Sequence, residues 1–268
     1  FILGKILGLR ISRMLFSFIF LFLAPKFKSI KTIEANLNNF SKNISSQEKE
    51  KIISEMWKNY GMTFVEYMYL NFFRKSNSHI SVFGENNLNN VVAKKTPAIF
   101  VSGHFANFEL MSMEISKKGI SLATIYRPLN NFFLNPMMEH LRKRYICANQ
   151  IKKGINGVRE AIEYIKKDFS IALMIDQRVS EGERISFFDK PALTTTLPAQ
   201  LAIKYNLPII PVFIKRTSKN NFILEFYKEI NPKIFKNKTE LTLKLNQELE
   251  KMIRKNPTQW IWSHNRWK

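Results

Sequence analysis

The pattern of apolar and polar residues divides the chain near residue 25. Before that point the sequence is predominantly apolar, with an uninterrupted apolar or small run from Met14 to Ala24, MLFSFIFLFLA. This run is shorter than the roughly 20 residues that a membrane-spanning helix needs, but the apolar stretch counted from Phe1 is long enough. We therefore predict a membrane-anchoring helix over residues 1–24, in preference to a helix buried inside the protein.

Basic residues lie in the first half of this segment, at Lys5, Arg10 and Arg13. Long basic side chains can extend to a membrane surface while their helix stays in hydrocarbon, and basic ends tend to face the cytoplasm. A cleaved signal peptide is less consistent with the sequence, because Ala24-Pro25-Lys26 is a poor cleavage site. The sequence begins at Phe1 rather than at a methionine, which leaves room for a longer apolar segment.

After residue 25 the pattern becomes that of a globular domain. Ser45 and Glu48 form a capping box ahead of a helical pattern from Gln47 to about Phe73, in which Gly61 predicts a bend. Short β-like runs follow at Ile80–Phe83, Ala98–Val101, Ser121–Tyr126, Ile171–Ile175, Ile209–Ile214 and Phe222–Tyr227. Helical patterns lie between them, at Asn107–Lys117, Phe132–Arg144, Gly157–Lys167 and Pro198–Tyr205. A last helix, with Asn237 and Glu240 as its expected capping residues, runs to about Arg254. This alternation predicts an α/β fold, with one mixed-sheet domain over residues 25–268 and helices on the faces of its sheet.

The composition allows a large core and a strongly charged surface. Hydrophobic residues make up 45% of the chain, which excludes wholesale disorder. The formal net charge of +21 favours anionic partners such as nucleic acid, an anionic membrane, an acidic protein or a phosphorylated substrate. A biased coding composition would also produce this richness in Lys, Asn, Ile and Phe, so charge alone selects no partner.

Cys147 is the only cysteine, which excludes an intrachain disulfide and a cysteine-based zinc site, and no nucleophile motif surrounds it.

The segment Gly103–Glu109 carries the strongest candidate chemistry. It follows the β-like run Ala98–Val101 directly, so we expect His104 at an exposed corner between a strand and a helix. A histidine there can accept a proton from a hydroxyl, and a carboxylate on its second ring nitrogen would fix the tautomer. Five residues along a regular helix rotate by about 140°, so His104 must precede the helix and Glu109 must lie in its first or second turn. The spacing alone is weak evidence, because it arises often by chance.

Gly103–Glu109 resembles the His-x4-Asp/Glu block of the late acyltransferases of lipid A biosynthesis, the lauroyl and myristoyl transferase family. Further blocks resemble that family in the correct order, at Ile33–Glu66, Tyr126–Asn130, Asp176-Gln177, Phe187–Ala202 and Trp260–Lys268. The resemblance covers nearly the whole chain. There are three departures, at Ala106 and Asp189, where the family often has glycine, and at Phe108, where it usually has tryptophan. We expect Asp189 to affect a loop near the substrate and the other two to leave catalysis intact.

The resemblance implies that the protein moves a fatty acyl chain from the thioester of acyl carrier protein to a hydroxyl of a lipid A precursor. His104 would be the general base and Glu109 its partner, with no cofactor and no metal ion, and the acyl donor would be the thioester of acyl carrier protein or of coenzyme A. The acidic carrier protein, an anionic glycolipid and the cytoplasmic face of the bacterial inner membrane would be the partners of a monomeric enzyme. Nucleic acid is not expected, since no known nucleic-acid-binding motif is present.

Three more residues, at the ends of β-like runs, are candidates for substrate binding. Arg127 suits an oxyanion or a phosphate of the acceptor, although an ion pair with Asp176 is an equal alternative. Asp176 and Gln177 end another run, where open α/β sheets often carry their sites. His264 lies among tryptophans, and we favour a place in an interfacial aromatic cluster over a catalytic role.

Two other functions remain open from the sequence alone. A related acyltransferase that acts on a glycerolipid, an aminolipid or a glycosylated lipid would carry the same catalytic block. A basic, membrane-attached protein that binds nucleic acid or lipid without catalysis would explain the charge and the apolar segment but not the ordered blocks.

Overall fold

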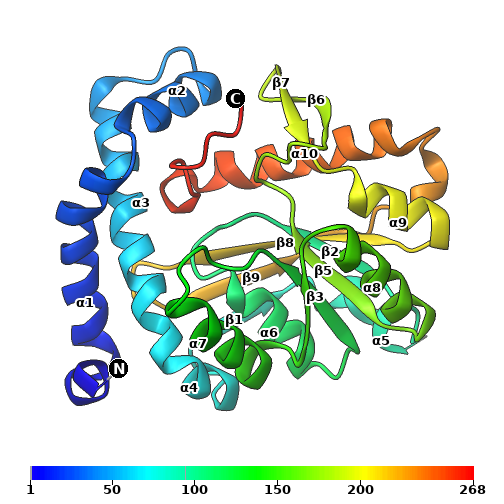
Figure 1. The fold of residues 1–268 in the computed structure, drawn as a ribbon, viewed down its shortest axis with the longest axis horizontal. Coiled ribbons are helices and arrows are strands. Elements are labelled where there is room, and N and C mark those ends of the chain that lie inside the picture. The colour runs from blue at the N-terminus through cyan, green and yellow to red at the C-terminus, as the bar shows by residue number, and fades with distance from the viewer. Residues whose placement is uncertain (1, 94) are drawn as a thin grey trace.

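The central element of the fold is a seven-stranded sheet. The structure is a computed structural model that describes residues 2–93 and 95–268, with side chains from residue 6. In the described part of the chain the strands follow the order β1 (Ile80–Phe83), β9 (Phe222–Phe226), β8 (Ile209–Arg216), β2 (Ile99–Ser102), β5 (Ser170–Met174), β3 (Leu122–Tyr126), β4 (Asn149–Lys152) (Figure 1). Strands β8, β2, β5, β3 and β4 are parallel, whereas β9 pairs antiparallel with β8 and β1 lies parallel to β9. The predicted mixed sheet is therefore confirmed.

All six predicted strands are present, and three further strands were not predicted. Strand β4 is an edge strand with only one buried residue, Ile151, so it lacks the apolar run that marks a strand in sequence. Strands β6 (Glu183–Phe187) and β7 (Lys190–Thr194) form a separate antiparallel hairpin. The two turn residues between them, Phe188 and Asp189, both have left-handed backbones, with φ of 51° and 58°. Glycine is the usual signal for such a turn, and its absence hid the hairpin.

Two pairs of helices pack against different strands of the sheet. Helices α6 (Glu109–Lys117) and α8 (Ile155–Lys166) contact β3, while α9 (Leu197–Tyr205) and α10 (Lys238–Lys255) contact β2 and β8 respectively. Helix α7 (Leu134–Leu141) continues into a π-helical turn, Arg142–Ile146, and short helices α4 (Leu70–Lys75) and α5 (Asn89–Ala93) precede β1 and β2. Two predicted N-caps are confirmed, since Ser45 and Asn237 accept hydrogen bonds from the backbone N–H groups of Glu48 and Glu240.

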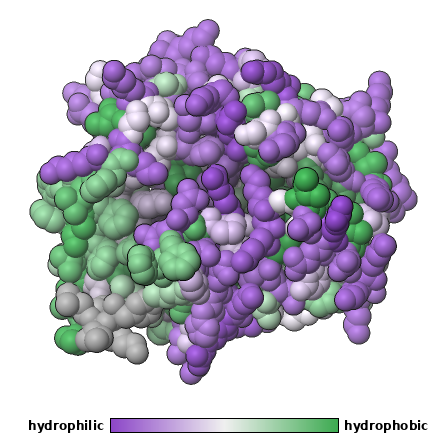
Figure 2. Space-filling view, viewed as in Figure 1, coloured by the Kyte–Doolittle hydropathy of each residue, from purple (hydrophilic) through white to green (hydrophobic). Residues whose placement is uncertain are grey.

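Helix α1 (Ile2–Phe27) lies alongside α3 (Ser46–Glu66), and α2 (Ile30–Phe40) connects them (Figure 1). The segment Ile6–Phe27 is long and apolar enough to cross a membrane, judged by length and composition only. Its outer side exposes seven large apolar residues: Ile6, Ile11, Met14, Phe18, Phe22, Leu23 and Phe27. Figure 2 shows hydrophobic surface gathered along this edge of the molecule. The expectation that Arg13 extends to a membrane surface is wrong, because its side chain is buried against Glu66 of α3.

Gly61 determines how closely α1 and α3 approach each other. Helix α3 runs from Ser46 to Glu66 through this residue, so the predicted bend does not interrupt it. A Cβ atom at Gly61 would lie 2.9 Å from the Cβ atom of Phe20, and closer still to the carbonyl oxygen of Phe16. Glycine is therefore needed for contact between the helices.

We predict that Gly61→Val separates α1 from α3, because the added side chain would overlap the backbone of α1. Such overpacking typically costs about 1–3 kcal/mol. Chemical denaturation of the detergent-solubilised protein measures the loss of stability. Lys51→Val places the same β-branched residue at an exposed position of α3 and is the control. Equal stability of the two variants would contradict the prediction.

Candidate active site

Four of the five predicted site residues follow strands at one edge of the sheet, and Glu109 lies at the start of α6. Strands β2, β5 and β3 are adjacent and parallel, so their carboxyl ends lie side by side. His104 follows β2, Asp176 follows β5 and Arg127 follows β3. Helix α6 begins only at Glu109, which confirms that His104 precedes the helix at the corner after β2. The arrangement places a histidine, a carboxylate and a guanidinium at neighbouring strand ends.

Two hydrogen bonds join His104 to Asp176. Nδ1 of the imidazole lies 2.7 Å from Oδ1 of Asp176, and the backbone N–H of His104 donates to Oδ2 at 2.7 Å. Asp176 is 1% exposed, whereas the side chain of His104 is 20% exposed. With Nδ1–H bound to a carboxylate, Nε2 keeps the lone pair that can accept a proton. The pair has the chemistry of a general base fixed in one tautomer.

Asp176 is held ionised by its hydrogen bonds. Burial alone would raise the pKa of its carboxyl group, but the charge and hydrogen bonds of His104, together with the indole N–H of Trp260, lower that pKa below its ordinary value. The Trp260 donor lies 2.8 Å from Oδ2. Gly103 leaves space for this arrangement, because a Cβ atom there would lie 3.2 Å from Oδ2 and 2.9 Å from Cδ1 of Leu249.

The carboxylate on Nδ1 of His104 was expected to be Glu109, and the structure places Asp176 there instead. Oε1 of Glu109 accepts hydrogen bonds from the hydroxyl of Tyr67 and from Nε of Arg142, the latter at 2.8 Å. Strand β5 lies directly beside β2, so Asp176 reaches the ring from the neighbouring strand end, while the first residue of α6 is engaged by the π-helical turn. A catalytic role for Glu109 stays a prediction.

The pair formed by Glu109 and Arg142 is buried and closely coupled. The two side chains are each 8% exposed, with Nη2 of Arg142 2.6 Å from Oε1 of Glu109. Burial would lower the pKa of the Arg142 guanidinium, but Glu109 and Tyr67 raise it overall. The pKa of the Tyr67 hydroxyl is raised well above its ordinary value, by burial and then by the Glu109 charge. This cluster fixes the start of α6 against the turn after α7.

The remaining predicted residues lie around the pair of His104 and Asp176. Arg127 is exposed, and the two oxygens of Asp176 are bonded to His104 and Trp260, so the alternative ion pair between Arg127 and Asp176 is not formed. Gln177 is half-buried, next to Asp176 in the chain. At this edge of the sheet Arg127 is therefore exposed and does not pair with the buried carboxylate of Asp176.

His264 is a neutral neighbour of the site. Its Nε2 accepts a hydrogen bond from the backbone N–H of Arg178 at 2.9 Å. Its pKa is lowered to about 4, chiefly by burial and further by the positive charges of Arg266 and Arg127, although Asp176 opposes the shift. A ring nitrogen that already accepts a backbone hydrogen bond is poorly suited to remove a proton from a substrate.

Three residues of this site were missed by the sequence reasoning: Trp260, Tyr67 and Arg142. Trp260 had a signal, since it lies in the C-terminal block that resembles the acyltransferase family. No sequence signal pointed to Tyr67 or Arg142, because they meet Glu109 only through the packing of the short 3-10 helix after α3, the start of α6 and the π-helical turn.

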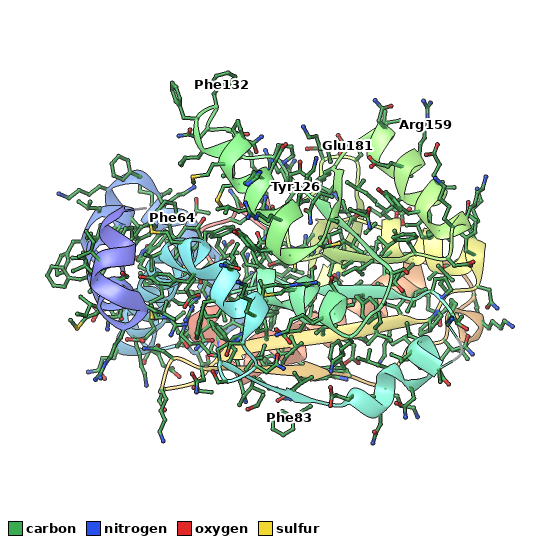
Figure 3. All side chains as sticks on the ribbon, turned by 90° about the horizontal axis from the view of Figure 1, so that it is seen from below. Phe64, Phe83, Tyr126, Phe132, Arg159 and Glu181 are labelled. Carbon is green, nitrogen blue, oxygen red and sulfur yellow. The ribbon has the colours of Figure 1, made fainter. Side chains whose placement is uncertain are left out.

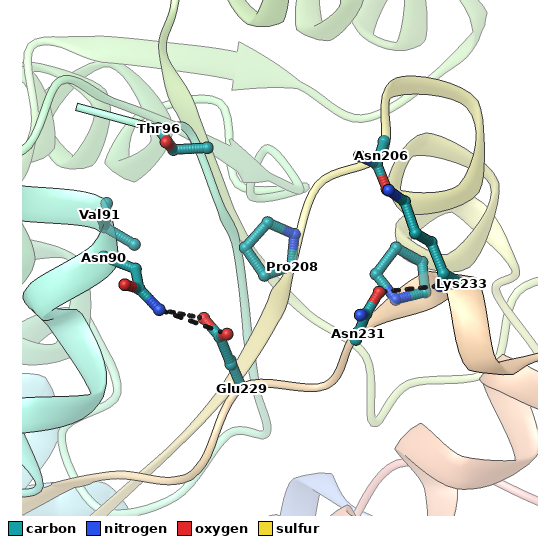
Figure 4. Close-up of a pocket in the computed structure, with 9 residues that line it drawn as sticks. Asn90, Val91, Thr96, Asn206, Pro208, Glu229, Asn231 and Lys233 are labelled. Atoms are coloured by element: carbon teal, nitrogen blue, oxygen red, sulfur yellow. Dashed lines mark hydrogen bonds between the residues drawn. The ribbon is translucent and has the colours of Figure 1, made fainter. Parts of the chain in front are cut away.

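A separate pocket of about 230 Å³ lies at the opposite end of the sheet (Figure 4). Thr96 and Pro208, which line it, precede β2 and β8, whereas His104 follows β2. The side chains of Asn90 and Glu229 interact across it at 3.4 Å. No group of three or more His, Cys, Asp or Glu within residues 2–93 and 95–268 is arranged to hold a metal ion.

The chain is similar in sequence to known proteins over most of its length. The sequence model of the family described as bacterial lipid A biosynthesis acyltransferase matches residues 2–268. The lipid A biosynthesis palmitoleoyltransferase of Escherichia coli (strain K12) is 24% identical over 230 residues, 84% of this chain and 74% of that protein. The lipid A biosynthesis lauroyltransferase of the same organism is 24% identical over 247 residues, 89% of this chain and 78% of that protein. The solved 1-acyl-sn-glycerophosphate (LPA) acyltransferase PlsC of Thermotoga maritima aligns with a TM-score of 0.45 and 17% identity, covering 95% of this chain and all of that one.

We predict that Glu109→Gln strongly destabilises the protein, because it leaves the Arg142 charge buried without a counter-charge. Removing one partner of a buried ion pair typically costs about 3–5 kcal/mol. Denaturant unfolding of Glu109→Gln, Arg142→Gln and the double variant measures the coupling, and the double variant should lose less than the sum of the single losses. Glu50→Gln, at an exposed position, is the control. Strictly additive losses would contradict the coupling.

Proposed function

This chain belongs to the bacterial lipid A biosynthesis acyltransferase family, and we propose that it transfers a fatty acyl group from acyl carrier protein to a hydroxyl of a lipid A precursor. The family match and the names of the two relatives support an acyltransferase of lipid A biosynthesis. The observation that carries the mechanism is the 2.7 Å contact between Nδ1 of His104 and the buried carboxylate of Asp176.

In the proposed reaction Nε2 of His104 removes the proton of the acceptor hydroxyl as its oxygen attacks the thioester carbonyl. The carbon–sulfur bond then breaks, and the imidazolium returns the proton to the leaving thiolate. Asp176 keeps Nδ1 protonated and stabilises the positive ring between these steps. The products are an ester and a free thiol, and no acyl-enzyme intermediate is required. Positioned general bases typically contribute about 10²–10⁴-fold, so alignment and charge stabilisation supply the remainder.

Positive charge around the site suits anionic substrates. Arg127 is exposed at the end of β3, and its charge contributes to the lowered pKa of Lys153, whose main cause is burial. We propose that the Arg127 guanidinium binds the oxyanion of the tetrahedral intermediate or a phosphate of the acceptor. We propose that Gln177, next to Asp176 in the chain, also binds the substrate. The net charge of +21 suits an acidic carrier protein and an anionic membrane.

We propose that the protein acts at the cytoplasmic face of the inner membrane, and the loop after β3 supports contact with a membrane surface. Phe132 and Phe133 are 83% and 87% exposed, and Phe132 projects from the molecule in Figure 3. The side-chain oxygen of Asn131 accepts hydrogen bonds from the backbone N–H groups of Phe133 and Leu134, which fold the chain into a turn beside the two rings. Two exposed apolar rings in the loop that begins at Arg127 suit insertion into a bilayer with anionic headgroups.

We predict that His104→Ala lowers kcat for acyl transfer by about 10²–10⁴-fold, the usual contribution of a positioned base. Asp176→Asn should lower kcat at least about 100-fold, because an amide can hold the ring in the wrong tautomer. The assay measures transfer from acyl-carrier-protein thioester to a lipid A precursor, with a glycerolipid acceptor in parallel. Asp168→Asn, before the opposite end of β5, is the control. Turnover of His104→Ala within a few-fold of the natural protein would overturn the mechanism, and transfer only to the glycerolipid would overturn the acceptor.

We predict that Phe132→Ser with Phe133→Ser lowers the rate on acceptor lipid in anionic vesicles by about tenfold. Full burial of one phenylalanine side chain in an apolar environment contributes about 1.5–3 kcal/mol of transfer free energy, and partial insertion into the bilayer gives part of that amount. The rate on acceptor dispersed in detergent micelles should stay unchanged. Phe83→Ser removes a 55% exposed phenylalanine on the opposite side of the molecule (Figure 3) and is the control. Equal losses in vesicles and micelles would exclude a membrane role for the loop.

A further inference from the structure

Arg13 is a charged residue buried at the contact between the apolar helix α1 and the domain. It is 7% exposed, and its Nε donates to Oε1 of Glu66 at 2.6 Å. Its guanidinium also lies over the rings of Phe73 and Phe222, 5.8 and 5.7 Å from their centroids. Arg10, one turn earlier in the same helix, is exposed. The two arginines of α1 therefore have different environments, and only Arg13 reaches into the domain.

Glu66 connects Arg13 to β8 and to the loop that carries His104. It is 0% exposed, and its Oε2 accepts hydrogen bonds from Nη2 of Arg216 at 3.0 Å and from Nδ2 of Asn107 at 2.9 Å. Burial alone would raise the pKa of Glu66, but the two arginines and Asn107 lower it below its ordinary value. The carboxylate is thus an ionised centre with partners from α1, β8 and the His104 loop.

The loop between His104 and Glu109 needs this support because its backbone is strained. Ala106 has a left-handed backbone, with φ of 43°, which is unfavourable for a residue with a side chain. Its carbonyl accepts a hydrogen bond from the hydroxyl of Thr63 at 2.9 Å, and its N–H donates to the carbonyl of Gln259 at 3.0 Å. Asn107, the next residue, is fully buried against Glu66. One turn of α3 therefore holds the loop at two consecutive residues.

We infer that Arg13 is a positioning residue for His104, acting through Glu66 and Asn107, so that the apolar helix α1 is part of the support of the active site. Without Arg13, Arg216 alone neutralises Glu66 and draws the carboxylate toward itself, away from Asn107. The hydrogen bond to Asn107 then weakens, and Ala106 loses part of the frame that holds its left-handed backbone. His104 moves relative to the acceptor hydroxyl, while the residues that bind substrate stay in place. The catalytic consequence rests on the proposed function of His104.

The test compares Arg13→Met with Arg10→Met in the full chain, purified in detergent. Both changes remove one positive charge from α1, and Arg10→Met does so at an exposed position, so it controls for the loss of surface charge. For Arg13→Met we expect kcat to fall about tenfold or more, because a misplacement of about 1 Å can cost about 10²-fold. KM should stay within about twofold, because substrate binding is not altered. Arg13→Lys should restore much of kcat, since an ammonium group can still pair with Glu66.

Hydrogen exchange gives a second readout that does not depend on activity. Backbone amides of residues 103–108 should exchange faster in Arg13→Met, while those of β5 and all amides of Arg10→Met keep their natural rates. If Arg13→Met does not fold, Arg13→Gln keeps an N–H donor for Glu66 and takes its place. Equal kcat and equal exchange in the Arg13 and Arg10 variants would overturn the inference. Absence of turnover in the natural protein would overturn the proposed function instead, and the exchange result would still decide the role of Arg13.

Discussion

The buried carboxylate of Asp176 is the constraint on which the site depends. An ionised carboxyl group away from water is stable only when hydrogen bonds replace its hydration. Asp176 obtains them from the backbone and ring of His104 after β2 and from the indole of Trp260 near the end of the chain. The hydrogen bonds from His104 that keep the Asp176 carboxylate charged also fix the orientation of the imidazole. The same bonds therefore stabilise the turn after β2 and prepare His104 to act as a base.

Two further buried carboxylates surround the His104 loop. Glu66 lies on one side, with Arg13 and Arg216, and Glu109 lies at its end, with Arg142. Each pair crosses between elements far apart in sequence, and each would be costly to break because the remaining charge would stay buried. Ion pairs of this kind contribute modestly to net stability, but they restrict the arrangement of the helices around the loop. A strained backbone at Ala106 can persist only in such a restricted setting.

The apolar helix α1 is connected to the loop that carries His104 through Arg13, Glu66 and Asn107. Helix α1 exposes apolar side chains on its outer side, and the side chain of Arg13 points inward and bonds Glu66. The same helix therefore forms a hydrophobic surface and contacts the interior of the domain. Gly61 permits this by letting the two helix backbones approach. Two of the three departures from the family pattern, Ala106 and Asp189, have positive φ, where glycine is the easier residue, so these substitutions place side chains on strained backbone.

The sequence by itself determined the α/β alternation, the six apolar strands, the two helix caps and the place of His104 at a strand end. These follow from local periodicity and from side chains that bond to nearby backbone. It did not determine β4 or the hairpin β6–β7, whose residues carry too little apolar pattern. Only the tertiary structure decided that Asp176 rather than Glu109 meets Nδ1 of His104, and that Arg13 faces the domain. Spacing along one chain cannot reveal which carboxylate a neighbouring strand brings to the ring, because strand order arises from packing of the whole sheet.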